Sequence, residues 1–434
     1  MHTHLVTVLG RGHTNRDPSA PSGRYATATY RFDDDHLETS TFFGLALLRF
    51  LRSPPAGDAP NSLIILGTTE SMWDGLVELL TDASDETASA AALKLFVTVS
   101  DRMRPLNTVD KDLLDELGEA LQTHLRSGGA RGLQVRLGLI PEARDAAQQL
   151  RIVHGLSELV GDRDRLWLDI THGLRHQGAI LVSAANYLSH ARSCKVLGIY
   201  YGAFELRGRG EPPAIQLDAL ERLAAWQAAM ERYDATGDFG ELTRVVEPTH
   251  PELGQALARL GFFERSFQPQ RAADARVAAL ASLNQVTDGT LAALFRPRLQ
   301  ARITGQLADG DLASQQLTLA RKALAHGQPV MAATYAHESW VSAHTQFRGL
   351  APRDHEARKT AVRGRHGVTC KAFHDLRKLR NVLVHGMGAH VAEPGGWPQR
   401  ALVSQEALTE RLDKLIAISG CAGLCSHATW ERGL

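Results

Sequence analysis

A short segment near the C-terminus, from Arg380 to His385, carries side chains whose chemistry suits RNA cleavage. In a helix that turns by about 100° per residue, Asn381 and His385 share one face. The opposite face carries an apolar stripe formed by Leu376, Leu379 and Leu383. We therefore expect the imidazole to point away from the core. An imidazole with a pKa near ~6.5 transfers protons at neutral pH, and a guanidinium stabilises charge on a phosphate.

These residue types fit metal-independent cleavage of RNA. In that reaction the ribose 2′-hydroxyl attacks the neighbouring phosphate, so the protein supplies neither a nucleophile nor a metal ion. The spacing of arginine and histidine alone is weak evidence, because it occurs by chance in many chains. The elements around it must therefore be considered.

Composition indicates a multidomain globular protein. The chain has 434 residues, of which 44% are hydrophobic and 22% are charged. Lysine and arginine number 48 and so do aspartate and glutamate, so any RNA contact must come from a local patch. The four cysteines, Cys194, Cys370, Cys421 and Cys425, show no paired spacing and are expected to be free thiols in a reducing cytoplasm. No basic leader and no long apolar run is seen, so secretion and membrane spanning are not expected.

The first half of the chain alternates short apolar runs with amphipathic stretches. Gly, Asp or Thr bounds the runs, as is typical of strands in a sheet covered on both faces. We expect strands at 5–9, 63–66, 93–99, 135–139, 166–170 and 196–201, and helices at 38–51, 73–80, 111–125, 142–159 and 178–190. This order predicts an α/β, doubly wound Rossmann-like domain. From Leu217 onward, helical patterns predict an all-α region, with joints around 207–213 and 237–251.

Three loops after expected strands carry groups that suit an anion. Parallel strands end at one edge of a sheet, where such domains bind ligands, so we expect these loops to converge. Glycines let backbone N–H groups approach a phosphate, and hydroxyls before a helix N-terminus add donors. The candidate ligand residues are Gly10, Arg11, Gly12, Thr68, Thr69, Glu70, Ser71, Met72, Trp73, Thr171, His172, Gly173 and Arg175. Taken singly, a tight turn or an ordinary helix cap explains each loop about as well.

The loop Asp169-Ile170-Thr171-His172-Gly173 resembles the DxTHG signature of CRISPR-associated proteins with an N-terminal CARF domain. Further matches are Val8-Leu9-Gly10, the 67–73 segment with Ser71-Met72-Trp73, and the 199–205 segment. Arg11 stands where this family is expected to have a small residue. In that family a CARF dimer senses a cyclic oligoadenylate made by a type III CRISPR effector. The resemblance thus implies cyclic tetra-adenylate, or a related ring, as allosteric activator.

The segment Arg380-Asn381-x3-His385 resembles the catalytic motif of HEPN ribonucleases, and the helical patterns at 317–325 and 330–347, with Glu338, resemble the helices that precede it. The resemblance implies that His385 is a general acid or base, that Arg380 neutralises the scissile phosphate and that Asn381 orients one of them. It also implies a homodimer whose paired helices form one cleft. We expect a CARF domain at 1–210, a helical connector at 211–310 and a HEPN domain at 311–434.

The whole sequence predicts a cytoplasmic endoribonuclease that cleaves single-stranded RNA, is activated by cyclic oligoadenylate, and has neither a metal nor a cofactor. Two alternatives remain open. One is a non-catalytic protein that binds RNA or a partner in response to the ring. The other is a CARF domain that cleaves its own ring, with Arg11, Thr171 or His172 near the reacting phosphate. A nicotinamide-dependent enzyme is less favoured, because the first turn lacks a complete GxGxxG pattern.

Overall fold

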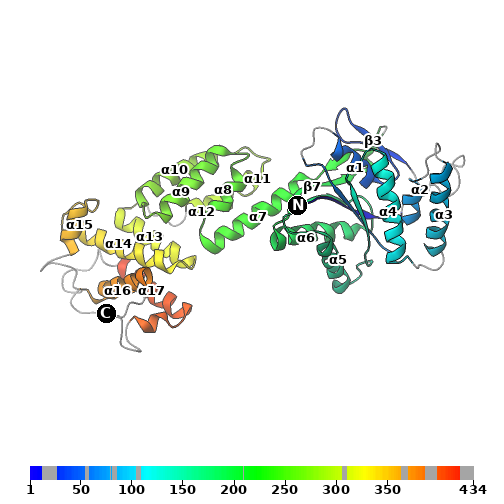
Figure 1. The fold of residues 1–434 in the computed structure, drawn as a ribbon. Coiled ribbons are helices and arrows are strands. Elements are labelled where there is room, and N and C mark those ends of the chain that lie inside the picture. The colour runs from blue at the N-terminus through cyan, green and yellow to red at the C-terminus, as the bar shows by residue number, and fades with distance from the viewer. Residues whose placement is uncertain are drawn as a thin grey trace. The chain divides into compact units, whose positions relative to one another are not determined.

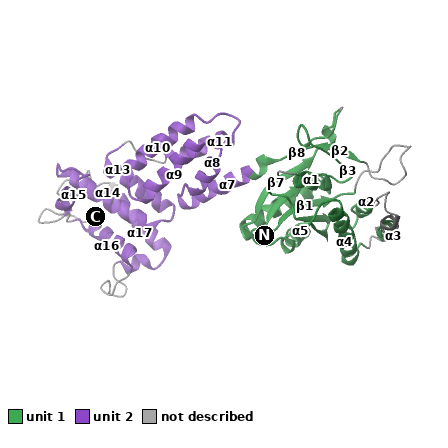
Figure 2. Ribbon diagram, turned by 45° about the horizontal axis from the view of Figure 1, so that its top comes forward, with its two compact units in different colours: residues 1–221 green, residues 222–434 purple. Residues whose placement is uncertain are grey.

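The chain divides into two compact units, residues 1–221 and residues 222–434 (Figure 2). A computed structural model describes residues 1–11, 27–53, 58–78, 80, 86–103, 109–208, 210–304, 310–362, 370–386 and 398–420. The expected division at residues 210 and 310 stays a prediction.

A six-stranded sheet forms the middle of the first unit, with the strand order β5-β4-β1-β6-β7-β8. Its strands are β1 (Thr3–Leu9), β4 (Ser62–Gly67), β5 (Gln134–Leu139), β6 (Arg165–Asp169), β7 (Lys195–Gly202) and β8 (Ala214–Gln216). All pairs are parallel except β7 with β8. The chain moves outward from β1 through β4 to β5 and then returns to β6 on the other side of β1. The α/β Rossmann-like prediction is therefore confirmed at the level of the sheet, and the reversal beside β1 is the place where such folds bind ligands.

Helices cover both faces of this sheet (Figure 1). The helices of the first unit are α1 (Phe43–Arg52), α2 (Trp73–Glu78), α3 (Glu86–Met103), α4 (Lys111–Ser127), α5 (Ala146–Leu159) and α6 (Arg175–Arg192). Successive residues of a strand point to opposite faces, so Leu5 and Leu63 pack in one core, with α1 to α4, while Val6 and Ile64 pack in the other, with α5 and α6. Both faces being apolar explains the continuous hydrophobic runs in the sequence.

Two expected elements are wrong. Residues 93–99 were expected to be a strand but belong to α3. There the buried residues Ala92, Leu95 and Val99 recur at helical spacing, while Leu93 is 61% exposed. Residues 38–51 were expected to be one helix, but the chain first forms β3 (Leu37–Ser40), which pairs with β2 (Ala28–Arg31), and α1 begins only at Phe43. Both strands have only four residues, which is too short for their periodicity to be distinguished from that of a helix.

The second unit is helical throughout its described residues. It contains α7 (Asp218–Thr236, which begins in the first unit), α8 (Gly240–Val246), α9 (Pro251–Arg265), α10 (Pro269–Asn284), α11 (Leu291–Leu294), α12 (Arg296–Thr304), α13 (Leu312–Ala325), α14 (Pro329–Phe347), α15 (His355–Val362), α16 (Lys371–His385) and α17 (Gln405–Gly420). These helices form two hydrophobic cores, one between Trp226 and Ile303 and the other between Leu319 and Ile416.

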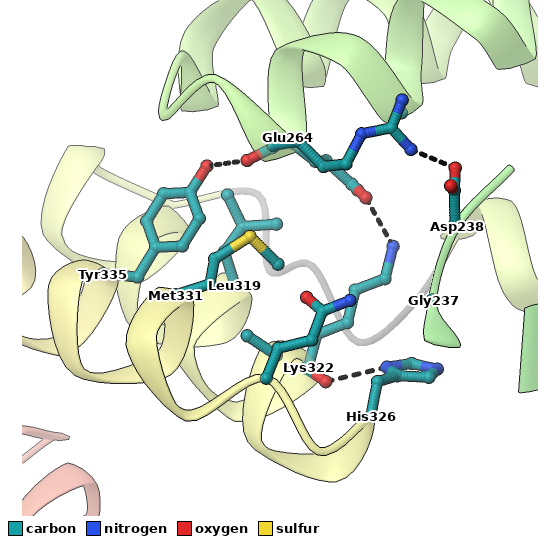
Figure 3. A pocket seen from close by; sticks show the side chains of 12 residues that line it. Gly237, Asp238, Glu264, Leu319, Lys322, His326, Met331 and Tyr335 are labelled. Carbon is teal, nitrogen blue, oxygen red and sulfur yellow. Dashed lines mark hydrogen bonds and ion pairs between the residues drawn. The ribbon is translucent and has the colours of Figure 1, made fainter. Parts of the chain in front are cut away.

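A buried ionic cluster joins helices of these two cores (Figure 3). Glu264 of α9 is 5% exposed, and its carboxylate accepts from Nζ of Lys322 on α13 at 2.7 Å and from Nη2 of Arg276 on α10 at 3.2 Å. The Tyr335 hydroxyl of α14 donates to the Glu264 carbonyl at 2.6 Å. Contacts to Glu264 thus hold three helices, α10, α13 and α14, against α9.

Candidate functional site

The three predicted loops meet at one edge of the sheet, because β4, β1 and β6 are adjacent and parallel. A pocket of about 260 Å³ lies between them. It is lined by Leu9, Gly10, Arg11, Thr68, Ser71, Glu142, Thr171, His172, Gly173, Leu174 and Gln177. Seven of the predicted ligand residues are in this set, and Gly12 lies outside the described residues.

Two glycines allow the β1 and β6 loops to touch. A Cβ on Gly10 would lie 2.8 Å from the backbone nitrogen of Gly173. Gly173 has a φ of +87°, and a Cβ there would lie 2.5 Å from Cγ1 of Val8. Only glycine tolerates both the positive φ and the close approach. The pocket floor therefore depends on glycine at both positions.

The loop after β4 is fastened to the end of β1. The Ser71 hydroxyl donates to the Leu9 carbonyl at 2.6 Å and accepts from the Thr68 N–H at 2.8 Å. The N–H of Met72 donates to the Gly10 carbonyl at 2.8 Å. The Ser71 hydroxyl thus holds the loop in place, although Ser71 also lines the pocket.

Met72 and Trp73 do not line this pocket, and their contact with a ligand stays a prediction. Both side chains lie in the hydrophobic core, at 2% and 0% exposure, and the Trp73 indole donates to the Thr68 carbonyl at 2.9 Å. Large apolar side chains that follow a strand pack inward as helix α2 begins. Thr69, Glu70 and Arg175 are also outside the lining set.

Beneath the pocket, Asp169 at the end of β6 is fully buried. Its carboxylate accepts from the Thr7 hydroxyl at 2.6 Å and from the Thr171 N–H at 2.8 Å. Burial raises the pKa of Asp169, although nearby His172 and these hydrogen bonds act in the opposite direction. The Thr171 hydroxyl oxygen in turn accepts a hydrogen bond from the Gly202 N–H at 2.8 Å. Asp169 and Gly202 thereby fix Thr171 at the pocket edge.

His172 is oriented by the first turn of α1. Its Nε2 accepts a hydrogen bond from the Phe43 N–H at 3.1 Å, and its ring lies 5.3 Å from that of Phe42. A neutral ring in this arrangement carries its proton on Nδ1. The first turn of α1 thus fixes the orientation of the His172 ring at the pocket.

Charged groups at the pocket come from separate loops. The Arg11 guanidinium forms an ion pair with Glu70, which joins the β1 loop to the β4 loop. Glu142 pairs with Arg144 at 2.5 Å. The sequence did not predict four of the lining residues, which are Leu9, Glu142, Leu174 and Gln177. Gln177 had a usable signal, since it is the third residue of α6 and its Oε1 accepts from the Leu174 N–H at 2.9 Å.

In the second unit, α16 presents the predicted catalytic residues. Leu376 and Leu379 are fully buried, Leu383 is half-buried, and Asn381 and His385 are exposed. These side chains divide between the two faces as the spacing predicts. Nη1 of Arg380 donates to Oδ1 of Asn381 at 2.9 Å. His385 is the last residue of the helix, followed by Gly386 at a φ of +74°.

Glu338 of α14 belongs to a separate ionic cluster. It pairs with Arg358 of α15 at 2.5 Å and with the neighbouring His337 at 3.3 Å. Burial alone would raise its pKa, but His337 and Arg358 lower the pKa of Glu338 overall. The His337 ring stacks on Phe373 of α16 at 5.2 Å. These contacts fix α15 and α16 against α14.

The described residues contain neither a metal-ligand cluster nor a membrane-spanning helix. That part of the chain has no group of three or more His, Cys, Asp or Glu arranged to hold a metal ion. None of its helices has the length and apolar character needed to cross a membrane. Cys194 and Cys370 are free thiols as predicted, and Cys421 and Cys425 lie outside the described residues.

Known proteins resemble the first unit most clearly. Residues 5–205 match the family model of the CARF domain of the CRISPR system endoribonuclease Csx1. Over 265 residues the chain is 23% identical to the CRISPR-associated protein MJ1674 of Methanocaldococcus jannaschii, a match that covers 59% of this chain and 40% of that protein. These similarities support a CRISPR-associated protein with an N-terminal CARF-type domain.

Proposed function

We propose that this protein is an endoribonuclease that cyclic oligoadenylate activates and that cleaves single-stranded RNA in type III CRISPR defence. The observation that carries the proposal is the pocket at the sheet reversal of a CARF-type domain, where the predicted loops bring together an arginine, a histidine and three hydroxyl side chains. A phosphodiester ring suits such a site, because glycine-rich loops and a guanidinium bind phosphate oxygens. Cyclic tetra-adenylate is the ring we favour.

The proposed catalytic group is Arg380, Asn381 and His385 of α16, in what we take to be a HEPN domain. His385 transfers a proton, and Arg380 stabilises the charge that develops on the phosphate when the 2′-hydroxyl attacks. The hydrogen bond from Arg380 to Asn381 supports the orienting role of the amide. One helix supplies half a site, so a homodimer would supply two facing copies.

Activation follows if the ring binds one arrangement of the dimer more tightly than another. The population of the cleavage-competent arrangement then rises with ring concentration. Full activity at a saturating ring concentration and little activity without it are the expected behaviour.

The decisive experiment measures cleavage of a fluorescent single-stranded RNA with cyclic oligoadenylates of several ring sizes. We expect cleavage only with a ring, and we expect His172→Ala to shift the activation curve to higher ring concentration. Titration calorimetry with cyclic tetra-adenylate measures binding separately. Ring binding without RNA cleavage would leave the non-catalytic alternative, and conversion of the ring to linear products would identify a ring nuclease. RNA cleavage that is indifferent to every ring would contradict the proposed activation.

A further inference from the structure

The ligand pocket contains little positive charge for a site that is proposed to hold phosphates. Among its described lining residues, Arg11 is the only lysine or arginine. Glu142 lines the same pocket, and buried Asp169 lies beneath it. The guanidinium of Arg11 is itself bound by Glu70. An anion that enters the pocket therefore meets a cation already paired with a carboxylate.

Backbone contacts hold both members of this pair in place. Arg11 follows Gly10, whose carbonyl accepts from the Met72 N–H at 2.8 Å. Glu70 lies within a turn closed by the hydrogen bond from the Ser71 N–H to the Thr68 carbonyl at 3.1 Å. The two loops are thus fixed to each other on either side of the ion pair. The Arg11 and Glu70 side chains are 66% and 42% exposed, so a ligand from solvent can reach them.

We propose that Glu70 is a specificity-determining residue that competes with ligand phosphate for Arg11. This inference rests on the proposed function, in which the pocket binds a phosphodiester ring. A phosphate must replace or share the Glu70 contact, and it also meets repulsion from the carboxylate. Repulsive groups of this kind select against ligands that cannot compensate through other contacts. A ring with several phosphates and bases compensates, whereas a lone phosphate or a mononucleotide does not.

The test compares wild type with Glu70→Gln, which keeps the size of the side chain and removes its charge. Titration calorimetry with cyclic tetra-adenylate is carried out at several salt concentrations. We expect Glu70→Gln to bind the ring roughly two- to fivefold more tightly, the scale of one exposed charge interaction. The dependence of affinity on salt should also become steeper, because the site gains net positive charge.

A matched control is Glu158→Gln, because Glu158 is an ion-paired, 69% exposed glutamate of α5 in the same unit. It should leave both affinity and salt dependence unchanged. Removing Arg11 as well, in Arg11→Ala with Glu70→Gln, should abolish most of the gain.

The two proposals fail in different ways. Unchanged or weaker ring binding by Glu70→Gln overturns the competition, and so does tighter binding with an unchanged salt dependence, since that would reflect loop rearrangement alone. If wild type binds none of the rings, the proposed function fails, whatever the variant does.

Discussion

Asp169 is the residue whose contacts connect the strands beneath the pocket. Its carboxylate accepts from Thr7 of β1 and from the Thr171 backbone, and both acceptor atoms are used. Asparagine has nearly the same shape and can keep both contacts, because the Thr7 hydroxyl can accept where it now donates. Replacing Asp169 by asparagine therefore removes the ionisable carboxyl group and keeps both hydrogen bonds.

The stability of Asp169→Asn relative to wild type should increase as the pH rises. The native pKa of Asp169 is raised by burial, so the native state binds a proton more readily than the unfolded chain. The contribution of Asp169 to the free energy of unfolding therefore falls as the pH increases from about 3.9, the pKa of an aspartate in the unfolded chain, through the native pKa. Melting temperatures measured across this pH range should show a widening advantage for the variant. Asp162→Asn, an exposed change in the same unit, should show no such trend.

His385→Ala and Arg380→Ala should each lower the RNA cleavage rate by about 10² or more, the scale of a lost general acid/base or charge stabiliser. Both side chains lie in the second unit, so calorimetry with cyclic tetra-adenylate should give nearly wild-type affinity. A His385→Ala protein with wild-type rate and products would show that the catalytic group lies elsewhere.

Single residues also show how far sequence reasoning reached. Spacing correctly predicted that Asn381 and His385 face away from Leu376 and Leu379, since helical geometry is local. It could not separate Thr171, which lines the pocket, from Trp73, which enters the core. Both follow strands, and only the packing of distant elements decides between them.

At the level of elements, the order of strands was predictable because five apolar runs are genuine parallel strands. The secondary structure of residues 93–99 was not predictable, because the apolar residues suit a helix and a strand equally well over so short a window. The partner of β3 was also hidden, since β2 contributes only a short segment to a two-stranded sheet.

Gly173→Ala should separate the ends of β1 and β6. The added Cβ meets Val8 at 2.5 Å in a backbone with a φ of +87°. We expect a loss of about 2 kcal/mol or more in unfolding free energy, together with weaker ring binding. Gly129→Ala is the matched control, because Gly129 has a φ of +104° and no atom near its missing Cβ. That variant should lose only about 1 kcal/mol. Equal losses would mean that contact with Val8 is unimportant.

Glu264→Gln should loosen the helices of the second unit. It leaves Lys322 and Arg276 buried without their anion, and breaking a buried pair in this way costs about 3–5 kcal/mol. Burial alone lowers the pKa of Lys322, but Glu264 raises that pKa overall. The variant loses this stabilisation of the charged lysine. Denaturant unfolding and hydrogen exchange in α13 measure the effect. Glu241→Gln, which affects an exposed ion pair in the same unit, should change stability by less than about 0.5 kcal/mol. A similar result for both variants would contradict a structural role for the buried cluster.

For the whole molecule, the proposed chemistry predicts that RNA cleavage persists in a chelator. A 2′-hydroxyl nucleophile with His385 and Arg380 requires only proton transfer and charge stabilisation. Cleavage of single-stranded RNA with cyclic tetra-adenylate should proceed at the same rate with and without EDTA. Activity that EDTA removes and Mg²⁺ or Mn²⁺ restores would contradict this mechanism.

The central position of β1 also determines when the first unit can fold during synthesis. β1 leaves the ribosome before β4 and β6, the two strands with which it pairs, and the last residue of β6 is Asp169. Until β6 emerges, one edge of an apolar strand has no partner, which favours binding by chaperones. Gly10 and Gly173 meet only after that point. The pocket is thus completed only after β6 has been synthesised, and a nascent chain that lacks β6 lacks one side of the pocket.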